Sequence, residues 1–229
     1  HTMENVFTLP DEVVKAFVGE RTFIEVEGHA GKTEFRLNPE VPLTMGPVDL
    51  QDYYFEHKLQ QVQAMNYALK VIPEVDAEYE KISGRSYGLL QPYMMEDAEV
   101  ALLGLGSTMG TVGYVVNELR KEGVKAGLIK MRVYRPFPSE ALVEALGETP
   151  VLGVMDKAIS FGSPGGPLFE DVVTTFYDEV EKPLIADYIY GLGGRDASPK
   201  LLRGMFESLL DIKEKGSVPS KVNYMGVRT

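Results

Sequence analysis

The stretch from residue 96 to 166 constrains the fold most, because short apolar runs alternate in it with helical patterns. Residues 98–105 form an apolar run that ends in a glycine turn, which is typical of a buried parallel strand. Residues 124–133 and 151–155 predict two further strands. Between the strands, a helical repeat precedes Gly123 and a short helix is expected from Ser139 as its N-cap. The order strand, helix, strand, helix, strand indicates a three-layer α/β/α core with a mostly parallel sheet.

The pattern continues after the third strand. A helix is expected over residues 167–180, with an apolar face that includes Val173 and Val180. Residues 183–189 predict a fourth strand. Ser198 followed by proline is a strong helix start, and the last helix should run to about Lys213. Residues 221–229 are expected to form a short polar tail.

The sequence before this core is of a different kind. Residues 1–49 predict an irregular connector that continues from an upstream domain, with a short helix after Pro10 and a weak strand at residues 22–26. Residues 50–95 predict a long helix with one apolar face, ended or kinked at Pro73, and then a linker. Residues 96–229 are the expected α/β domain.

Charge and hydropathy exclude several classes of partner. The formal net charge of the 229-residue chain is −11, which repels phosphate backbones, so nucleic acid is not an expected partner. No apolar run approaches the roughly 18 residues of a membrane helix, and no signal peptide pattern opens the sequence. A cytoplasmic chain without a membrane partner is therefore expected.

The sequence contains no cysteine, which excludes disulfides, a catalytic thiol and cysteine-held iron–sulfur clusters within this chain. Its three histidines, His1, His29 and His57, lack metal-ligand spacing and are interpreted as surface or packing residues. No nucleophile stands beside a base, and neither a P-loop nor a Gly-Asp-Gly magnesium site is present. The sequence therefore assigns no catalytic residue and no metal ligand.

Glycine-rich loops after the strands are the candidate sites. Gly104, Gly106 and Gly110 resemble a dinucleotide fingerprint, but one residue too many precedes the last glycine. The fingerprint also requires an acidic residue that holds the ribose, and Arg132 and Arg135 stand at that place instead. An arginine can bind a 2′-phosphate, so NADP binding stays an open alternative. A tight turn between a strand and a helix is the favoured interpretation.

Two other loops, residues 156–166 and 191–196, should lie beyond the carboxyl ends of strands, where parallel sheets place their functional groups. Backbone amides and cations there suit an anion, whereas an exposed aromatic side chain suits a contact with another subunit. Both interpretations stay open for one set of residues: Gly106, Ser107, Gly110, Lys157, Ser160, Phe161, Gly162 and Arg195.

A series of short motifs along the whole chain resembles the C-terminal part of the alpha subunit of pyruvate:ferredoxin oxidoreductase (pyruvate synthase) and related 2-oxoacid:ferredoxin oxidoreductases. Each motif is weak alone, but together they follow the order of that family. They are His1-Thr2-Met3-Glu4, Pro42-Leu43-Thr44-Met45-Gly46, Met95-Glu96-Asp97-Ala98-Glu99, Leu105-Gly106-Ser107, Gly110-Thr111, Val133-Tyr134-Arg135-Pro136-Phe137-Pro138, Ile159-Ser160-Phe161-Gly162, Gly191-Leu192-Gly193-Gly194-Arg195-Asp196 and Asn223-Tyr224-Met225-Gly226-Val227-Arg228.

The resemblance implies a domain like the C-terminal domain of transketolase. It also implies a complex that decarboxylates a 2-oxoacid, such as pyruvate, on thiamine diphosphate and passes electrons through iron–sulfur clusters to ferredoxin and the acyl group to coenzyme A. Thiamine diphosphate, magnesium and the clusters are expected in the complete complex, and none of them on this chain alone. The expected partners are the other subunits, with ferredoxin and coenzyme A acting through the complex. This part should organise subunits and be inactive in isolation.

Two other functions stay open. One is the equivalent domain of another thiamine enzyme, such as the beta subunit of a 2-oxoacid dehydrogenase. The other is a free-standing ligand-binding or interaction domain.

Overall fold

The computed structural model describes residues 8–20, 22–28, 31–44, 46 and 48–228. The family-like motif at residues 1–4, Met45 and His29 lie outside the described residues. Contacts divide the chain into two compact units, His1–Ser86 and Tyr87–Thr229. Within the described residues, every helix is too short or too polar to cross a membrane.

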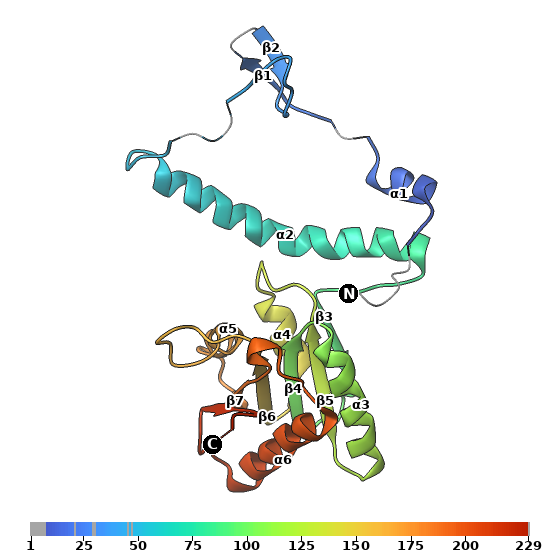
Figure 1. Ribbon diagram of the computed structural model, residues 1–229, viewed down its shortest axis with the longest axis vertical. Coiled ribbons are helices and arrows are strands. Elements are labelled where there is room, and N and C mark those ends of the chain that lie inside the picture. The colour runs from blue at the N-terminus through green and yellow to red at the C-terminus, as the bar shows by residue number, and fades with distance from the viewer. Residues whose placement is uncertain (1–7, 21, 29–30, 45, 47, 229) are drawn as a thin grey trace. The chain divides into compact units, whose positions relative to one another are not determined.

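The first unit contains two helices and a small hairpin (Figure 1). Helix α1 spans Asp11–Val18, and strands β1 (Glu25–Gly28) and β2 (Gly31–Glu34) pair antiparallel. The short helix after Pro10 is thus confirmed. The expected strand at residues 22–26 lies slightly later, as β1, and β2 lies in a segment that was expected to be irregular.

The long helix is α2, Tyr54–Ser83, which runs through Pro73 and ends at Gly84 in the left-handed conformation. This end matches the glycine stop in the sequence. The predicted apolar face is not buried within this unit, since no residue of α2 is buried and Phe55 is 80% exposed.

A six-stranded sheet forms the centre of the second unit. Its strands are β3 (Leu90–Tyr93), β4 (Val100–Leu105), β5 (Ala126–Met131), β6 (Val151–Asp156), β7 (Leu184–Ile189) and β8 (Val222–Tyr224). They lie in the order β3-β5-β4-β6-β7-β8, and every neighbouring pair is parallel except β3 with β5. The mostly parallel sheet is confirmed. Strand β3 lies in the expected linker and β8 in the expected polar tail, so those two expectations were wrong at these residues.

Helices cover both faces of this sheet (Figure 1). Helices α3 (Thr108–Lys121) and α6 (Pro199–Lys215) share one hydrophobic cluster with the sheet, and α4 (Ser139–Leu146) and α5 (Pro167–Thr175) share the other. The three-layer arrangement is therefore confirmed. Ser198 caps α6 as expected, because its side chain accepts a hydrogen bond from the Leu201 amide at 3.3 Å.

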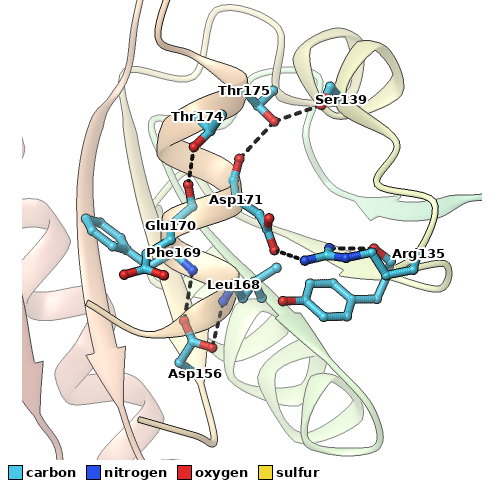
Figure 2. Close-up of polar contacts among 10 residues, drawn as sticks. Arg135, Ser139, Asp156, Leu168, Phe169, Glu170, Asp171, Thr174 and Thr175 are labelled. Atoms are coloured by element: carbon cyan, nitrogen blue, oxygen red, sulfur yellow. Dashed lines mark hydrogen bonds and ion pairs between the residues drawn. The ribbon is translucent and has the colours of Figure 1, made fainter. Parts of the chain in front are cut away.

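Two helix predictions were wrong in detail. Ser139 does not cap α4; its hydroxyl instead lies 3.0 Å from the hydroxyl of Thr175 (Figure 2). Helix α5 ends at Thr175 rather than near residue 180, which leaves Val180 97% exposed. Near its end, the hydroxyls of Thr174 and Thr175 donate to the carbonyls four residues earlier, a bond that weakens a helix slightly.

Arg120 ties three segments of the second unit together. Its Nε donates to the carbonyl of Ala126 at 2.6 Å, one Nη donates to the carbonyl of Met94 at 2.7 Å, and the other contacts Asp97 at 2.6 Å. The guanidinium thus holds α3, the start of β5 and the connection between β3 and β4. Met94 adopts φ = +54° in that connection, a conformation that non-glycine residues rarely take.

We predict that Arg120→Ala lowers the free energy of unfolding by about 2 kcal/mol, because two carbonyls lose a charged donor. Chemical denaturation monitored by circular dichroism measures the loss. The matched control is Arg203→Ala, which removes only surface ion pairs to Glu122 and Glu207 and should cost less. Equal losses for the two variants would show that Arg120 contributes no more than a surface arginine.

Candidate functional site

The carboxyl ends of β4, β6 and β7 meet along one edge of the sheet, because these strands are parallel neighbours. We call the loops that follow them, residues 106–107, 157–166 and 190–198, the carboxyl edge. The chain leaves β4 toward β5 on one side and later returns to β6 on the other. Such a reversal in strand order is where open α/β sheets usually bind ligands.

The carboxyl edge exposes apolar side chains from all three loops or the strand ends beside them. Phe161 is fully exposed, at 108% of its reference area, and Ile159 is half exposed. Leu105, at the end of β4, and Leu192, after β7, are also exposed. Exposed hydrophobic side chains on two adjacent loops and on the neighbouring strand end are more typical of an interaction surface than of solvent-facing loops.

Phe161 stands at the tip of a tight turn. The amide of Ser163 donates to the carbonyl of Ser160 at 3.1 Å, and Gly162 has φ = +74°. A turn with positive φ at its third residue is of type II and selects glycine there. The sequence Ser-Phe-Gly-Ser therefore holds the aromatic ring outward by local geometry.

The fingerprint-like glycines have separate roles. A Cβ on Gly104 would lie 2.7 Å from the sulfur of Met109 and 3.2 Å from the Cβ of Met155, so Gly104 permits close packing of α3 against the sheet. Gly106 turns the chain with φ = +75°, as the turn interpretation expects. Ser107 is the N-cap residue of α3 without a capping side-chain bond, and Gly110 faces open space.

Lys157 and the loop at residues 191–196 lie together. A Cβ on Gly191 would be 3.0 Å from Cε of Lys157 and 3.4 Å from the carbonyl oxygen of Arg195. The Arg195 guanidinium itself donates to the carbonyl of Gly226. Arg195 is thus occupied by the chain's own backbone, whereas Lys157 has an exposed side chain over a glycine backbone.

Two buried carboxylates lie beneath the carboxyl edge. Asp156, at the end of β6, accepts hydrogen bonds from the amides of Leu168 at 3.1 Å and Phe169 at 2.9 Å (Figure 2). Asp187, within β7, accepts one from the amide of Gly166 at 2.7 Å through Oδ2. Together they satisfy amides at the start of α5, where a helix carries unpaired donors and partial positive charge.

Asp187 is the less well satisfied of the two. It has no exposed surface, and within the described part of the chain its Oδ1 has no hydrogen-bond partner. Burial raises the pKa of Asp187 to about 6, and the nearby charge of Asp156 adds to the rise. Burial also raises the pKa of Asp156, although its two amide donors oppose the change.

The sequence carries a signal for these buried carboxylates. Asp187 interrupts the apolar run Leu-Ile-Ala-Asp-Tyr-Ile, and a carboxylate inside a buried parallel strand requires partners. The double glycine at Gly165 and Gly166 fits the same picture. A Cβ on Gly166 would lie 2.6 Å from the Cβ of Asp156, so the backbone approaches the carboxylates closely only because a side chain is absent.

The arginines after β5 are held by the protein itself. Arg135 contacts Asp171 on α5 at 2.8 Å (Figure 2). Its guanidinium also lies 4.1 Å from the centre of the Tyr134 ring. Arg132 donates to Gln91 at 2.6 Å and lies 5.0 Å from the ring of Tyr87. Both guanidiniums thus brace the fold, which does not favour the 2′-phosphate interpretation.

The carboxyl edge offers several kinds of binding group. It combines exposed apolar side chains, glycine backbone and the cation of Lys157. Among the residues that the structure describes, no three histidine, aspartate or glutamate side chains come close enough to hold a metal ion. Tyr190, at the end of β7, contacts Thr108 of α3, and burial raises its pKa.

Comparison with known proteins places this geometry in a family. Residues 98–202 match the family described as pyruvate:ferredoxin oxidoreductase core domain II. The chain is 43% identical to pyruvate synthase subunit PorA of Thermotoga maritima over all 229 residues, and 33% identical to ketoisovalerate oxidoreductase subunit VorA of Pyrococcus horikoshii over 225 residues.

The chain spans about half the length of these relatives, 55% in both cases. A solved structure of 2-oxoglutarate:ferredoxin oxidoreductase from Magnetococcus marinus is a weaker match, with a TM-score of 0.40 and 20% identity over 53% of this chain and 19% of that chain. The sequence matches decide the assignment: the chain belongs to the 2-oxoacid:ferredoxin oxidoreductase family and carries its core domain II.

Proposed function

We propose that this chain is part of an alpha subunit whose complex oxidatively decarboxylates a 2-oxoacid, with pyruvate as the favoured substrate. Coenzyme A would accept the acyl group and ferredoxin the electrons. The observation that carries the proposal is the 43% identity to a pyruvate synthase subunit over the full chain. The ketoisovalerate relative, at 33% identity, makes a branched 2-oxoacid the second candidate.

The cofactors of such a complex do not fit the residues of this chain. Iron–sulfur clusters need cysteine thiolates, and the sequence has none. The Gly-Asp-Gly pattern of a magnesium site for a diphosphate is also absent from the sequence. We therefore place thiamine diphosphate, magnesium and the clusters on other parts of the complex and assign this chain no chemical step.

We assign the chain the task of organising the complex through its carboxyl edge. The support is physical: two adjacent loops and the end of β4 expose apolar side chains, and one of the loops holds Phe161 outward on a type II turn. Anion binding by the same loops is less well supported, because Arg195 is engaged with Gly226. Of the two cations in these loops that were considered for an anion, Lys157 is the one that stays available to a ligand such as coenzyme A.

The activity test uses the complete complex. Ferredoxin reduction is measured with coenzyme A and one 2-oxoacid at a time, comparing pyruvate with 2-oxoisovalerate. The proposal expects coenzyme A-dependent reduction that is fastest with pyruvate. A complex that reduces NAD but not ferredoxin would instead indicate a 2-oxoacid dehydrogenase.

For the interface, we predict that Phe161→Ala weakens association of this subunit with its partners about tenfold or more. A large aromatic side chain at the centre of an interface commonly contributes this much. Native mass spectrometry or analytical ultracentrifugation of the complex measures the change. Because Phe161 is fully exposed, its truncation should not alter the stability of the subunit.

The matched control is Tyr114→Ala, which removes an exposed aromatic ring from α3 away from the carboxyl edge. It should leave assembly unchanged. Wild-type assembly of the Phe161→Ala variant would rule out the carboxyl edge as the main contact surface.

A further inference from the structure

A concave surface lies between α5 and the start of β7, and Pro164 of the carboxyl edge forms part of its rim. It is a groove of about 560 Å³. Apolar side chains form most of its wall, among them Phe169, Val173, Phe176 and Ile185. This volume and lining are within the range of small-molecule sites in proteins.

The strand that borders the groove has an open edge. Strand β8 pairs with β7 only from Asp187 to Ile189. The amide of Asp187 and the carbonyl of Ile189 both form hydrogen bonds on the side of β8. Backbone groups of every second residue in a strand point to the same side, so those of Ile185 also point to the side of β8. Within the described chain, β8 does not reach Ile185. The amide of Ile185 is therefore available to donate a hydrogen bond to a ligand beside the apolar wall.

Two lysines border the groove as well. Lys182 donates to the carbonyl of Tyr177, two residues after the end of α5, where a cation is favourable. Lys221 forms no ion pair with any residue that the structure describes. The carboxylate in the wall, Glu170, accepts a hydrogen bond from Ser163. On a chain with a formal net charge of −11, an unpaired lysine beside an open amide favours an anionic ligand group.

We propose that this groove binds a small amphipathic carboxylate. Its apolar part packs against Val173, Phe176 and Ile185, and its carboxylate lies near Lys221 and the open edge of β7. Binding in this groove does not depend on the oxidoreductase assignment.

The test compares octanoate with octanol, its neutral counterpart, by calorimetric titration of the complete subunit. Octanoate should bind in a saturable way, about fivefold more tightly than octanol, which is the scale of one exposed ion pair. Lys221→Gln should remove that difference without changing octanol binding. Val173→Gln should weaken both ligands, because it places a polar group in the apolar wall.

Lys200→Gln removes an exposed lysine at the start of α6 and serves as the matched control, which should bind like the wild type. Thermal unfolding confirms that each variant is folded. Three results overturn the proposal: no saturable octanoate binding, equal affinity for octanoate and octanol, or octanoate affinity that Lys221→Gln leaves unchanged.

Discussion

Gly166→Ala is expected to lower the free energy of unfolding by about 3 kcal/mol, although the substitution adds only one methyl group. The backbone of Gly166 has φ = −74°, which any residue can adopt, so conformational strain is not the reason. The reason is space, since the new Cβ would lie 2.6 Å from the Cβ of Asp156 on a buried strand. Relief of this contact must move Asp156 away from the amides of Leu168 and Phe169 or Gly166 away from Asp187.

Gly204→Ala provides the control for this prediction. Gly204 lies in α6, and a Cβ there meets nothing within 4 Å. Alanine should therefore stabilise the protein by up to about 1 kcal/mol, because it is the better helix former. Urea denaturation of the two variants measures both effects. A Gly166→Ala variant as stable as the wild type would show that the start of α5 is not packed on the carboxylates as described.

Asp187→Asn is expected to remove a pH-dependent loss of stability. The pKa of Asp187 is about 6 in the folded protein, against an ordinary value of 3.8. Since the folded state holds the proton more tightly, the contribution of Asp187 to stability is fully present below pH 4 and is lost as the pH rises through 6, by about 3 kcal/mol in total. Asparagine keeps an acceptor for the Gly166 amide and carries no charge. The variant should therefore gain stability relative to the wild type as the pH rises from 4 to 7.

The comparison is made by denaturation at a series of pH values, with Asp97→Asn as the control. Arg120 lowers the pKa of Asp97, so the ion pair contributes stability above the ordinary pKa and loses it at lower pH. That variant should change little between pH 5 and 7. A constant difference between wild type and Asp187→Asn across pH 4 to 7 would contradict the assignment of a raised pKa to Asp187.

The central strands and helices could be predicted because burial shapes the sequence there. Strands β4 and β6 are apolar runs, β7 is apolar apart from Asp187, and α6 begins at a serine and proline pair that its structure uses. At the sheet edges this signal is lost. Strand β3 contains Pro92, which edge strands tolerate, and β8 has three residues, none of which is buried. Their pairing depends on partners far away in the sequence.

Several family motifs hold the fold together, which sequence reasoning alone could not distinguish from binding roles. In the motif at residues 95–99, Asp97 pairs with Arg120 at 2.6 Å and Glu99 with Lys213 at 2.5 Å. In the motif at residues 133–138, Arg135 braces α5 through Asp171. Phe161 belongs to a different class, since its ring contributes nothing to packing of its own unit. Only the three-dimensional contacts separate these roles.

The roles of the two buried carboxylates also depend on contacts that the sequence does not reveal. Asp156 was visible as the end of a strand, but its role depends on α5 returning over the sheet so that two amides point at it. Asp187 is 31 residues further along the chain, yet both act on the same helix start. Charge within an apolar run predicts that a partner exists; it does not predict which segment supplies it.

The most direct test of the account is the rate of 2-oxoacid-dependent ferredoxin reduction per assembled complex. It is measured for Phe161→Ala and Lys157→Gln after assembled and unassembled protein have been separated. We predict the wild-type rate per complex for both variants, even where Phe161→Ala lowers the assembled fraction. A variant complex that assembles fully yet loses about 100-fold of its rate, as removal of a catalytic acid or base does, would place the carboxyl edge within the catalytic machinery and contradict the account.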